Sequence, residues 1–168
     1  MNPLSIRFAL YTLAGTTAWI FIEHMAGFNT TNFAIGEITH NFAMIAFWIL
    51  IFVEVYFQRK ENGNSLTFKE GFLSAFQFSI FYCIGFALLI AFYQHIVNPE
   101  YYENYKAFVL ERLHQQNATQ ETIDSTMKEV DLVNNGSLVS YSMMFLYSMI
   151  LAVGLSAIAA GIFKRKSA

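Results

Sequence analysis

Residues 71–99, GFLSAFQFSIFYCIGFALLIAFYQHIVNP, contain no Asp, Glu, Lys or Arg. A helix crosses roughly 30 Å of hydrocarbon with about 20 apolar residues, and this stretch exceeds that length. The same four residue types are absent from residues 8–22, 38–53 and 132–163. A soluble helical bundle would instead carry charge along the outer face of every helix. The pattern therefore predicts an all-α integral membrane protein with four transmembrane helices.

The composition agrees with a single membrane domain over residues 1–168. Hydrophobic residues make up 55% of the chain and charged residues 13%, whereas soluble domains carry about 25% charge. We predict transmembrane helices over about 5–27, 36–58, 69–96 and 137–163. The second is the weakest, because its charge-free part must extend past His40 or Glu54 to cross the membrane. The first has only Arg7 before it and no clear cleavage site, so we expect a retained signal-anchor helix.

Basic residues gather on alternate sides of these helices. Seven of the ten Lys and Arg residues lie in the N-terminal segment, in residues 58–70 and in the C-terminal tail. Residues 98–136 hold the other three, together with an excess of Asp and Glu. Because short cytoplasmic loops are enriched in Lys and Arg, we expect both termini in the cytoplasm and residues 98–136 outside. Two termini on one side agree with an even number of crossings.

The acidic outer segment is predicted to form a helical hairpin over about 98–134. Asn98 is a good N-cap and Pro99 suits the first helical position. Turn-forming residues interrupt the segment at 117–119 and end it at 134–136. We expect the apolar face of the hairpin to be covered by lipid headgroups, by the top of the bundle or by a second copy of the protein. That face comprises Tyr102, Tyr105, Val109 and Leu113, followed by Ile123, Met127 and Val130.

Small side chains recur every four residues along the third predicted span, and a similar patch lies near the end of the fourth. Small residues let helix backbones approach closely in lipid, where no hydrophobic force drives association. We therefore predict that the third and fourth transmembrane helices cross closely. The predicted packing residues are Gly71, Ala75, Ser79, Cys83, Ala87 and Ala91 in the third span, and Ala152, Ser156 and Ala160 in the fourth.

Five ionisable residues mark the outer ends of the predicted spans. Glu23 and His24 end the first helix, Glu37 and His40 begin the second, and His95 ends the third. Glu37 and His40 are three residues apart, which places them on one helix face as in di-iron bundles, but a di-iron site needs a second such pair. The five residues are candidates for a single-metal site, for a proton or substrate pathway, or for hydrated groups bonded to each other and to loop backbone.

Glu54 is the ionisable residue closest to the inner end of the second span. A charge at the centre of a bilayer costs roughly 2.5–3.5 kcal/mol. Glu54 lies about one helical turn from Arg59 and Lys60. We therefore expect it to reach the inner interface or to pair with one of these two residues.

Several functional classes lack support in the sequence. The net charge of −2 provides no electrostatic footprint for nucleic acid. The single cysteine, Cys83, allows neither an intramolecular disulfide nor a cysteine-based zinc site. The common hydrolase, metalloprotease and nucleotide-binding motifs are missing from the sequence. We expect no enzymatic activity and no cofactor.

Short segments mark the openings and ends of the predicted helices. They are residues 35–37 and Met44, residues 62–63 and 66–72, residues 98–101 and 120–123, and residues 154–157 and 163–166. In this order and spacing they resemble an uncharacterised family of small bacterial membrane proteins, the domain-of-unknown-function family 4199. The resemblance covers nearly the whole chain and implies four transmembrane helices in a bacterial inner membrane. It implies no known activity and therefore assigns no functional residues.

Three functions remain open at this point. The small-residue ladder and the hairpin favour a protein that acts by association, as a membrane-complex subunit or a homo-oligomer. The outer polar residues would suit the mouth of a small transporter or channel, although no internal inverted repeat is evident. A metal-dependent membrane enzyme is the third possibility. Beyond the lipid bilayer, the expected partner is a second copy or another membrane protein.

Overall fold

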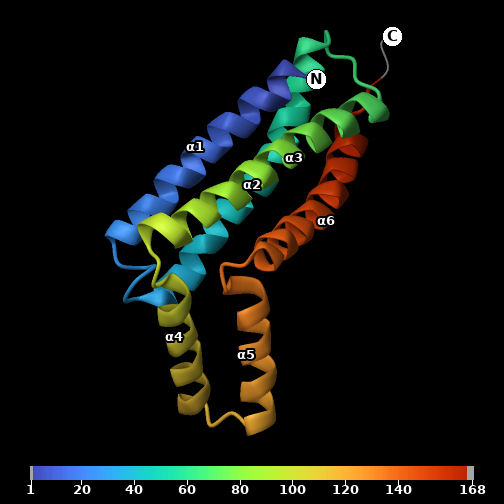
Figure 1. Ribbon diagram of the computed structural model, residues 1–168. Coiled ribbons are helices and arrows are strands. Elements are labelled where there is room, and N and C mark those ends of the chain that lie inside the picture. The colour runs from blue at the N-terminus through green and yellow to red at the C-terminus, as the bar shows by residue number, and fades with distance from the viewer. Residues whose placement is uncertain (1, 166–168) are drawn as a thin grey trace.

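The computed structural model describes residues 2–165, and the described chain is entirely helical apart from turns and one isolated bridge. Four of its helices are long and apolar enough to span a membrane, and a pair of shorter helices lies between the third and fourth of them (Figure 1). The predicted all-α architecture with four spans and an intervening hairpin is confirmed. The helices are α1 Pro3–Met25, α2 Phe33–Glu61, α3 Phe68–Phe92, α4 Tyr101–Gln115, α5 Gln120–Asn134 and α6 Leu138–Phe163, and the π-helical turn η1 Tyr93–Val97 extends α3.

The bundle is built around α2 and α3. Each of these two helices packs against the other, and both contact α1 and α6, which flank them. The start of α1 and the end of α6 lie at one end of the bundle, and the α4–α5 hairpin projects from the opposite end (Figure 1). We refer to these as the basic end and the hairpin end.

The most extensive contact between helices joins α3 and α6. The α3 residues Gly71, Ala75, Ser79 and Cys83 are buried, whereas Ala87 and Ala91, nearer the hairpin end, are half-buried. On α6, Ala152, Ser156 and Ala160 are each fully buried. A methyl group built on Gly71 would lie 3.3 Å from the Ala160 Cβ. Small side chains therefore set the short distance between these two backbones.

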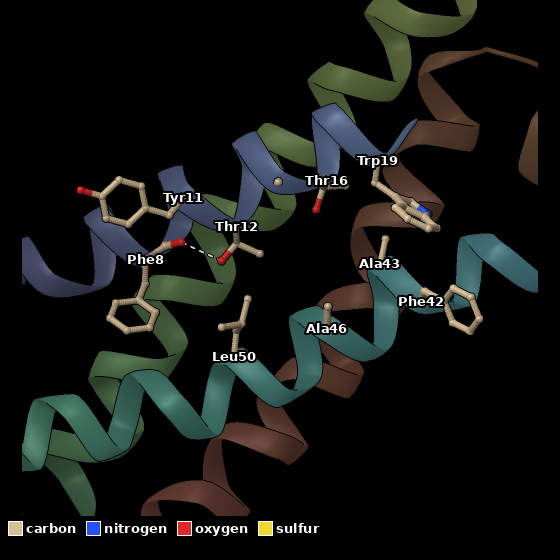
Figure 2. A pocket seen from close by; sticks show the side chains of 10 residues that line it. Phe8, Tyr11, Thr12, Thr16, Trp19, Phe42, Ala43, Ala46 and Leu50 are labelled. Atoms are coloured by element: carbon tan, nitrogen blue, oxygen red, sulfur yellow. Dashed lines mark hydrogen bonds between the residues drawn. The ribbon is translucent and has the colours of Figure 1, made fainter. Parts of the chain in front are cut away.

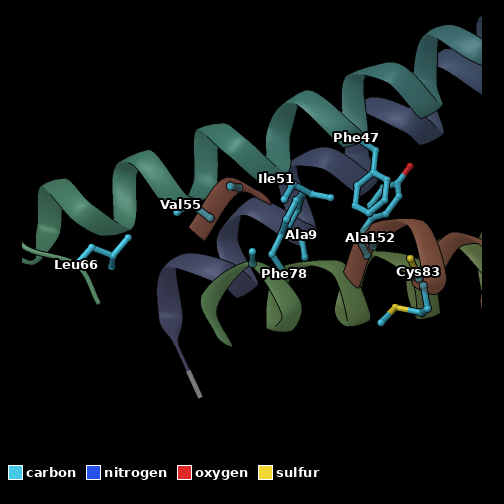
Figure 3. Packing of buried hydrophobic residues seen from close by; sticks show 12 residues of the cluster. Ala9, Phe47, Ile51, Val55, Leu66, Phe78, Cys83 and Ala152 are labelled. Atoms are coloured by element: carbon cyan, nitrogen blue, oxygen red, sulfur yellow. The ribbon is translucent and has the colours of Figure 1, made fainter. Parts of the chain in front are cut away.

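One hydrophobic core runs through the middle of the bundle (Figure 3). Phe47 of α2 and Tyr82 of α3 stack with their ring centroids 4.2 Å apart. Ile51, Val55 and Phe78 are fully buried beside them. Large apolar side chains such as Leu88 and Ile150 remain exposed on the outer faces of the spans, and in a membrane these faces contact lipid.

The basic end is closed by contacts between the α2–α3 loop and the end of α6. Leu66 and Arg165 exchange two backbone hydrogen bonds, each 2.8 Å long. The Arg59 guanidinium lies over the rings of Tyr56 and Phe163, at 5.5 and 5.8 Å from their centroids. Thr67 and Glu70 form a reciprocal capping box that starts α3.

The hairpin begins later than the sequence predicted. α4 starts at Tyr101, and Asn98 does not cap it. The Asn98 amide instead donates a 2.8 Å hydrogen bond to the carbonyl of Asn29, in the α1–α2 loop. The capping prediction is wrong because this long-range acceptor lies on a loop that is distant in sequence. Asn98 therefore ties the hairpin base to the other loop at the hairpin end.

The apolar face of the hairpin is covered within the hairpin itself. Val109 and Leu113 of α4 pack against Ile123 and Val130 of α5, and all four are buried. The top of the bundle, one of the expected covers, also contributes, because the buried Phe33 of α2 packs against the rings of Tyr101, Tyr105 and Phe108. Cover of α4 by α5 was not among the expected alternatives. The apolar faces of α4 and α5 pack against each other, so the hairpin has its own small hydrophobic core.

A larger side chain at Gly71 is expected to push α3 and α6 apart. Gly71→Leu would place its Cβ 3.0 Å from Leu66 and 3.3 Å from Ala160, and overpacking of this kind costs about 1–3 kcal/mol. Gly161→Leu is the matched control, because no heavy atom lies within 4 Å of a Cβ built there. Thermal unfolding in detergent should show a lower midpoint for Gly71→Leu only. Equal midpoints would contradict the packing assignment.

Candidate functional site

The histidines predicted at the hairpin end do not converge. Within residues 2–165, no three His, Cys, Asp or Glu side chains are grouped closely enough to hold a metal ion. Each imidazole has a different partner: His24 Nδ1 lies 2.9 Å from the Tyr93 hydroxyl, His40 Nε2 lies 3.3 Å from Glu23 Oε2, and His95 Nε2 lies 3.1 Å from the Gly136 carbonyl. The geometry gives a candidate metal centre no support.

Glu23 and His40 are the two predicted residues that come together. The Glu23 side chain is 1% exposed, whereas that of His40 is 41% exposed. Trp19 donates its indole N–H to Glu23 Oε1 at 2.9 Å and also approaches the Thr39 carbonyl at 3.2 Å. The other carboxylate oxygen, Oε2, lies 3.3 Å from His40 Nε2 but accepts no well-aligned hydrogen bond from the described residues. Glu23 is therefore a buried carboxylate that is held in place but only partly satisfied.

A cavity of about 330 Å³ lies beside this pair and extends across the bundle toward α6. We call it the outer chamber. Its walls come from the four spans, from η1 and from the ends of α4 and α5. Its size and mixed lining are typical of small-molecule sites. The polar residues that line it are Glu23, Asn29, His40, Asn41, Gln94 and Asn134, with the hydroxyl-bearing Thr16, Tyr82, Tyr93, Tyr101, Tyr141 and Ser148.

Two local features shape the outer chamber. The π-helical turn at the end of α3 carries Tyr93 and Gln94, both of which line the chamber, and π-turns are frequent at functional sites. Asn29 is 1% exposed and also lines it, but neither side-chain atom of Asn29 has a hydrogen-bond partner among the described residues. Its amide lies near the Tyr93 hydroxyl without a well-formed bond. A buried amide of this kind is costly unless a ligand or water satisfies it.

Glu37 binds residues of the hairpin and does not line the outer chamber. Its carboxylate forms an ion pair with Arg112 of α4 and accepts a hydrogen bond from the Tyr105 hydroxyl at 3.1 Å. Burial and the nearby negative charge of Glu37 raise the pKa of Tyr105 to about 12, so its hydroxyl remains a donor. Within the hairpin, Lys106 and Tyr102 hydrogen-bond to Asp131 and lower its pKa. These contacts orient the hairpin on the start of α2.

Glu54 forms a second polar cluster near the basic end. It is fully buried, and its Oε1 accepts hydrogen bonds from Ser5 at 2.8 Å and from Ser74 at 2.5 Å. The expectation that it would reach the interface or pair with Arg59 or Lys60 is wrong. Hydroxyl groups from α1 and α3 reach the carboxylate, so α1, α2 and α3 are joined by hydrogen bonds inside the bundle.

An apolar groove of about 450 Å³ lies between α1 and α2 (Figure 2). Gly15 lies within it, and no heavy atom lies within 4 Å of a Cβ built on this residue. Ala43 and Ala46 face it from α2, so small residues line both sides of the groove (Figure 2). At one end Trp19 and Phe42 border it, with ring centroids 6.2 Å apart. The groove is therefore an apolar surface with small residues at its centre, and it lies between two membrane spans.

Several chamber residues were not identified from the sequence. Trp19, Asn29, Tyr93 and Tyr101 line the chamber, but none of them was assigned to a site from the sequence. The break in helical geometry at Tyr93–Val97 also has no local signal, because this segment lacks Gly and Pro. Only the Glu23 and His40 positions were marked in advance, because charge inside a span is rare.

The fold and its polar sites define a small four-span helical membrane protein. Residues 7–165 match the family described as "Protein of unknown function (DUF4199)", and the chain belongs to this family. The resemblance found in the sequence is thus confirmed over nearly the whole chain. No curated protein and no solved structure matches it.

The Glu54 cluster is expected to contribute to stability. Ser74→Ala removes a hydroxyl donor from the buried carboxylate, which should lower the free energy of unfolding by about 1–3 kcal/mol. Ser142→Ala is the control, because Ser142 is exposed and bonds only to the Leu138 carbonyl of its own helix. Denaturant unfolding in detergent would measure both. A Ser74→Ala protein as stable as the control would argue against the network.

Proposed function

We propose that this protein acts by association and not by catalysis, as a homo-oligomer or as a subunit of a membrane complex. The observation that supports the proposal is the groove between α1 and α2. Its small residues leave the backbone of α1 accessible around Gly15, and close backbone approach is the main basis of helix association in lipid. In the proposed homo-oligomer, a helix of a second copy lies in this groove.

The small residues of α3 and α6 that pack inside the bundle do not provide such a surface. Gly71, Ala75, Ala152 and Ala160 are already buried against neighbouring helices of the same chain. The hairpin core is likewise internal. Gly154 and Gly161 of α6 are also open, but neither lines a described groove; the groove beside Gly15 combines an open glycine with a concave apolar surface at membrane depth.

Filling the groove is expected to weaken association without disturbing the fold. Gly15→Leu adds a side chain where a Cβ meets no atom within 4 Å. We expect the dissociation constant of the oligomer in nanodiscs to rise roughly tenfold, the effect of about 1.4 kcal/mol at one contact. Native mass spectrometry and cross-linking would measure it.

Gly154→Leu is the matched control for that experiment. Gly154 is also a helical glycine with nothing within 4 Å of its built Cβ, but it lies on α6, away from the groove. It should leave the oligomer unchanged. A wild-type protein that is monomeric in nanodiscs and purifies with no partner would contradict the proposal, as would equal weakening by the two variants.

We also propose that the protein resides in a bacterial inner membrane with both termini in the cytoplasm and residues 98–136 outside. The support is the charge distribution. Arg59, Lys60, Lys69, Lys164 and Arg165 all lie at the basic end, and the acidic hairpin lies at the other. This polarity matches the preference of Lys and Arg for the cytoplasmic side.

A small transporter or channel is the second candidate. The outer chamber, with Glu23 and His40 at one side, is the observation that favours it. His24, Glu37 and His95 do not line the chamber and make separate contacts. A metal-dependent enzyme is not proposed further, because the three histidines have separate partners.

A further inference from the structure

We propose that the outer chamber is a binding site for a small organic cation with an ammonium group. Three features carry this inference: a buried, partly satisfied carboxylate, a wall of aromatic rings, and an unpartnered amide. The inference does not depend on association, because Gly15 lies in the groove and does not line the chamber.

The carboxylate supplies the charge complement. Glu23 is fully buried; its Oε2 lies 3.3 Å from His40 Nε2 but forms no well-aligned hydrogen bond within residues 2–165. Of the described residues that line the chamber, none is Lys or Arg, and His40 lies at the exposed edge. A buried carboxylate without a full complement of partners is unfavourable. A cationic ligand beside Oε2 would supply the charge pairing that the partly exposed His40 leaves incomplete.

Aromatic rings supply the second element of cation recognition. A cation over a ring face gains about 0.5–2 kcal/mol, more when water is excluded, and quaternary ammonium groups are recognised by such cages. The chamber holds rings from every helix that surrounds it except α5. They are Trp19, Phe47, Tyr82, Phe86, Tyr93, Tyr101 and Tyr141.

Asn29 indicates that the ligand also has a hydrogen-bonding group. Its amide nitrogen and oxygen are both buried without partners among the described residues. The Asn98 side chain fixes the Asn29 backbone by donating to its carbonyl, so this amide is held at the chamber wall. A hydroxyl or carbonyl on the ligand would satisfy it.

The size and opening of the chamber fit a small ligand. A volume of about 330 Å³ is at the lower end of the range for small-molecule sites. His40 and Asn41 line the chamber and are partly or fully exposed on α2. Ligand entry therefore passes these residues, at the hairpin end of α2.

Choline is the probe for the test, because it combines a quaternary ammonium with one hydroxyl. Isothermal titration of the full-length protein in nanodiscs should show saturable binding. The neutral isostere 3,3-dimethylbutan-1-ol, with the same shape and no charge, should bind about tenfold more weakly. Glu23→Gln should weaken choline binding about tenfold while keeping an oxygen to accept from Trp19.

Two further variants separate recognition from folding. Phe86→Leu removes a ring but keeps an apolar wall, so it should weaken choline more than the neutral isostere. Glu100→Gln changes an exposed carboxylate outside the chamber and should leave choline affinity within about twofold. Equal binding of choline and its isostere, or an unaffected Glu23→Gln protein, would overturn the proposal. So would the absence of binding by choline and by tetramethylammonium up to about 100 mM.

Discussion

The cost of placing charge in hydrocarbon constrains every part of this structure. Four long segments avoid Asp, Glu, Lys and Arg, and they become the four spans. Two carboxylates nevertheless lie fully buried within the bundle, Glu23 and Glu54. Each is held by donors from its own or neighbouring helices, because an isolated buried carboxylate is strongly unfavourable. The same cost of burying charge therefore explains why polar side chains on α1 and α3 lie beside the two carboxylates.

The two buried carboxylates differ in their surroundings. We assign Glu54 a role in stability and Glu23 a role in ligand binding because of this difference. Glu54 Oε1 accepts hydrogen bonds from serine hydroxyls that join three helices; its Oε2 has no hydrogen-bond partner among the described residues, but Glu54 lines neither the groove nor the outer chamber. Glu23 lies beside a cavity, with Oε1 accepting a hydrogen bond from Trp19 and Oε2 lying 3.3 Å from Nε2 of the partly exposed His40. The first arrangement fixes the bundle at its basic end. The second leaves an interaction available at the hairpin end, where a ligand can supply it.

The fold was largely predictable because span length, charge and turn residues are local properties of the chain. The hairpin and its helical spacing were also visible, since Val109, Leu113, Ile123 and Val130 recur with the period of a helix. That they cover each other was not, because the sequence does not show which amphipathic faces meet. The small residues of α3 and α6 were marked by spacing alone.

The polar sites were only partly predictable because their partners are distant in sequence. Glu54 was assigned to Arg59 or Lys60, which are close in the chain, but its donors Ser5 and Ser74 lie 49 and 20 positions away. Arg112 lies 75 positions from Glu37. The outer chamber depends on Asn29 and on a π-helical turn at Tyr93, and neither has a distinctive local pattern. Only tertiary packing brings these groups together.

The orientation of the bundle is the claim on which the proposed roles of both ends depend. It can be measured by cysteine labelling in intact cells, using a background in which the buried Cys83 is replaced by alanine. Single cysteines would be placed at the exposed positions Asp124 in the hairpin and Glu61 at the basic end. A membrane-impermeant maleimide should label the Asp124→Cys protein in intact cells and the Glu61→Cys protein only after the membrane is opened. Labelling in the reverse order, or of both positions in intact cells, would contradict this account.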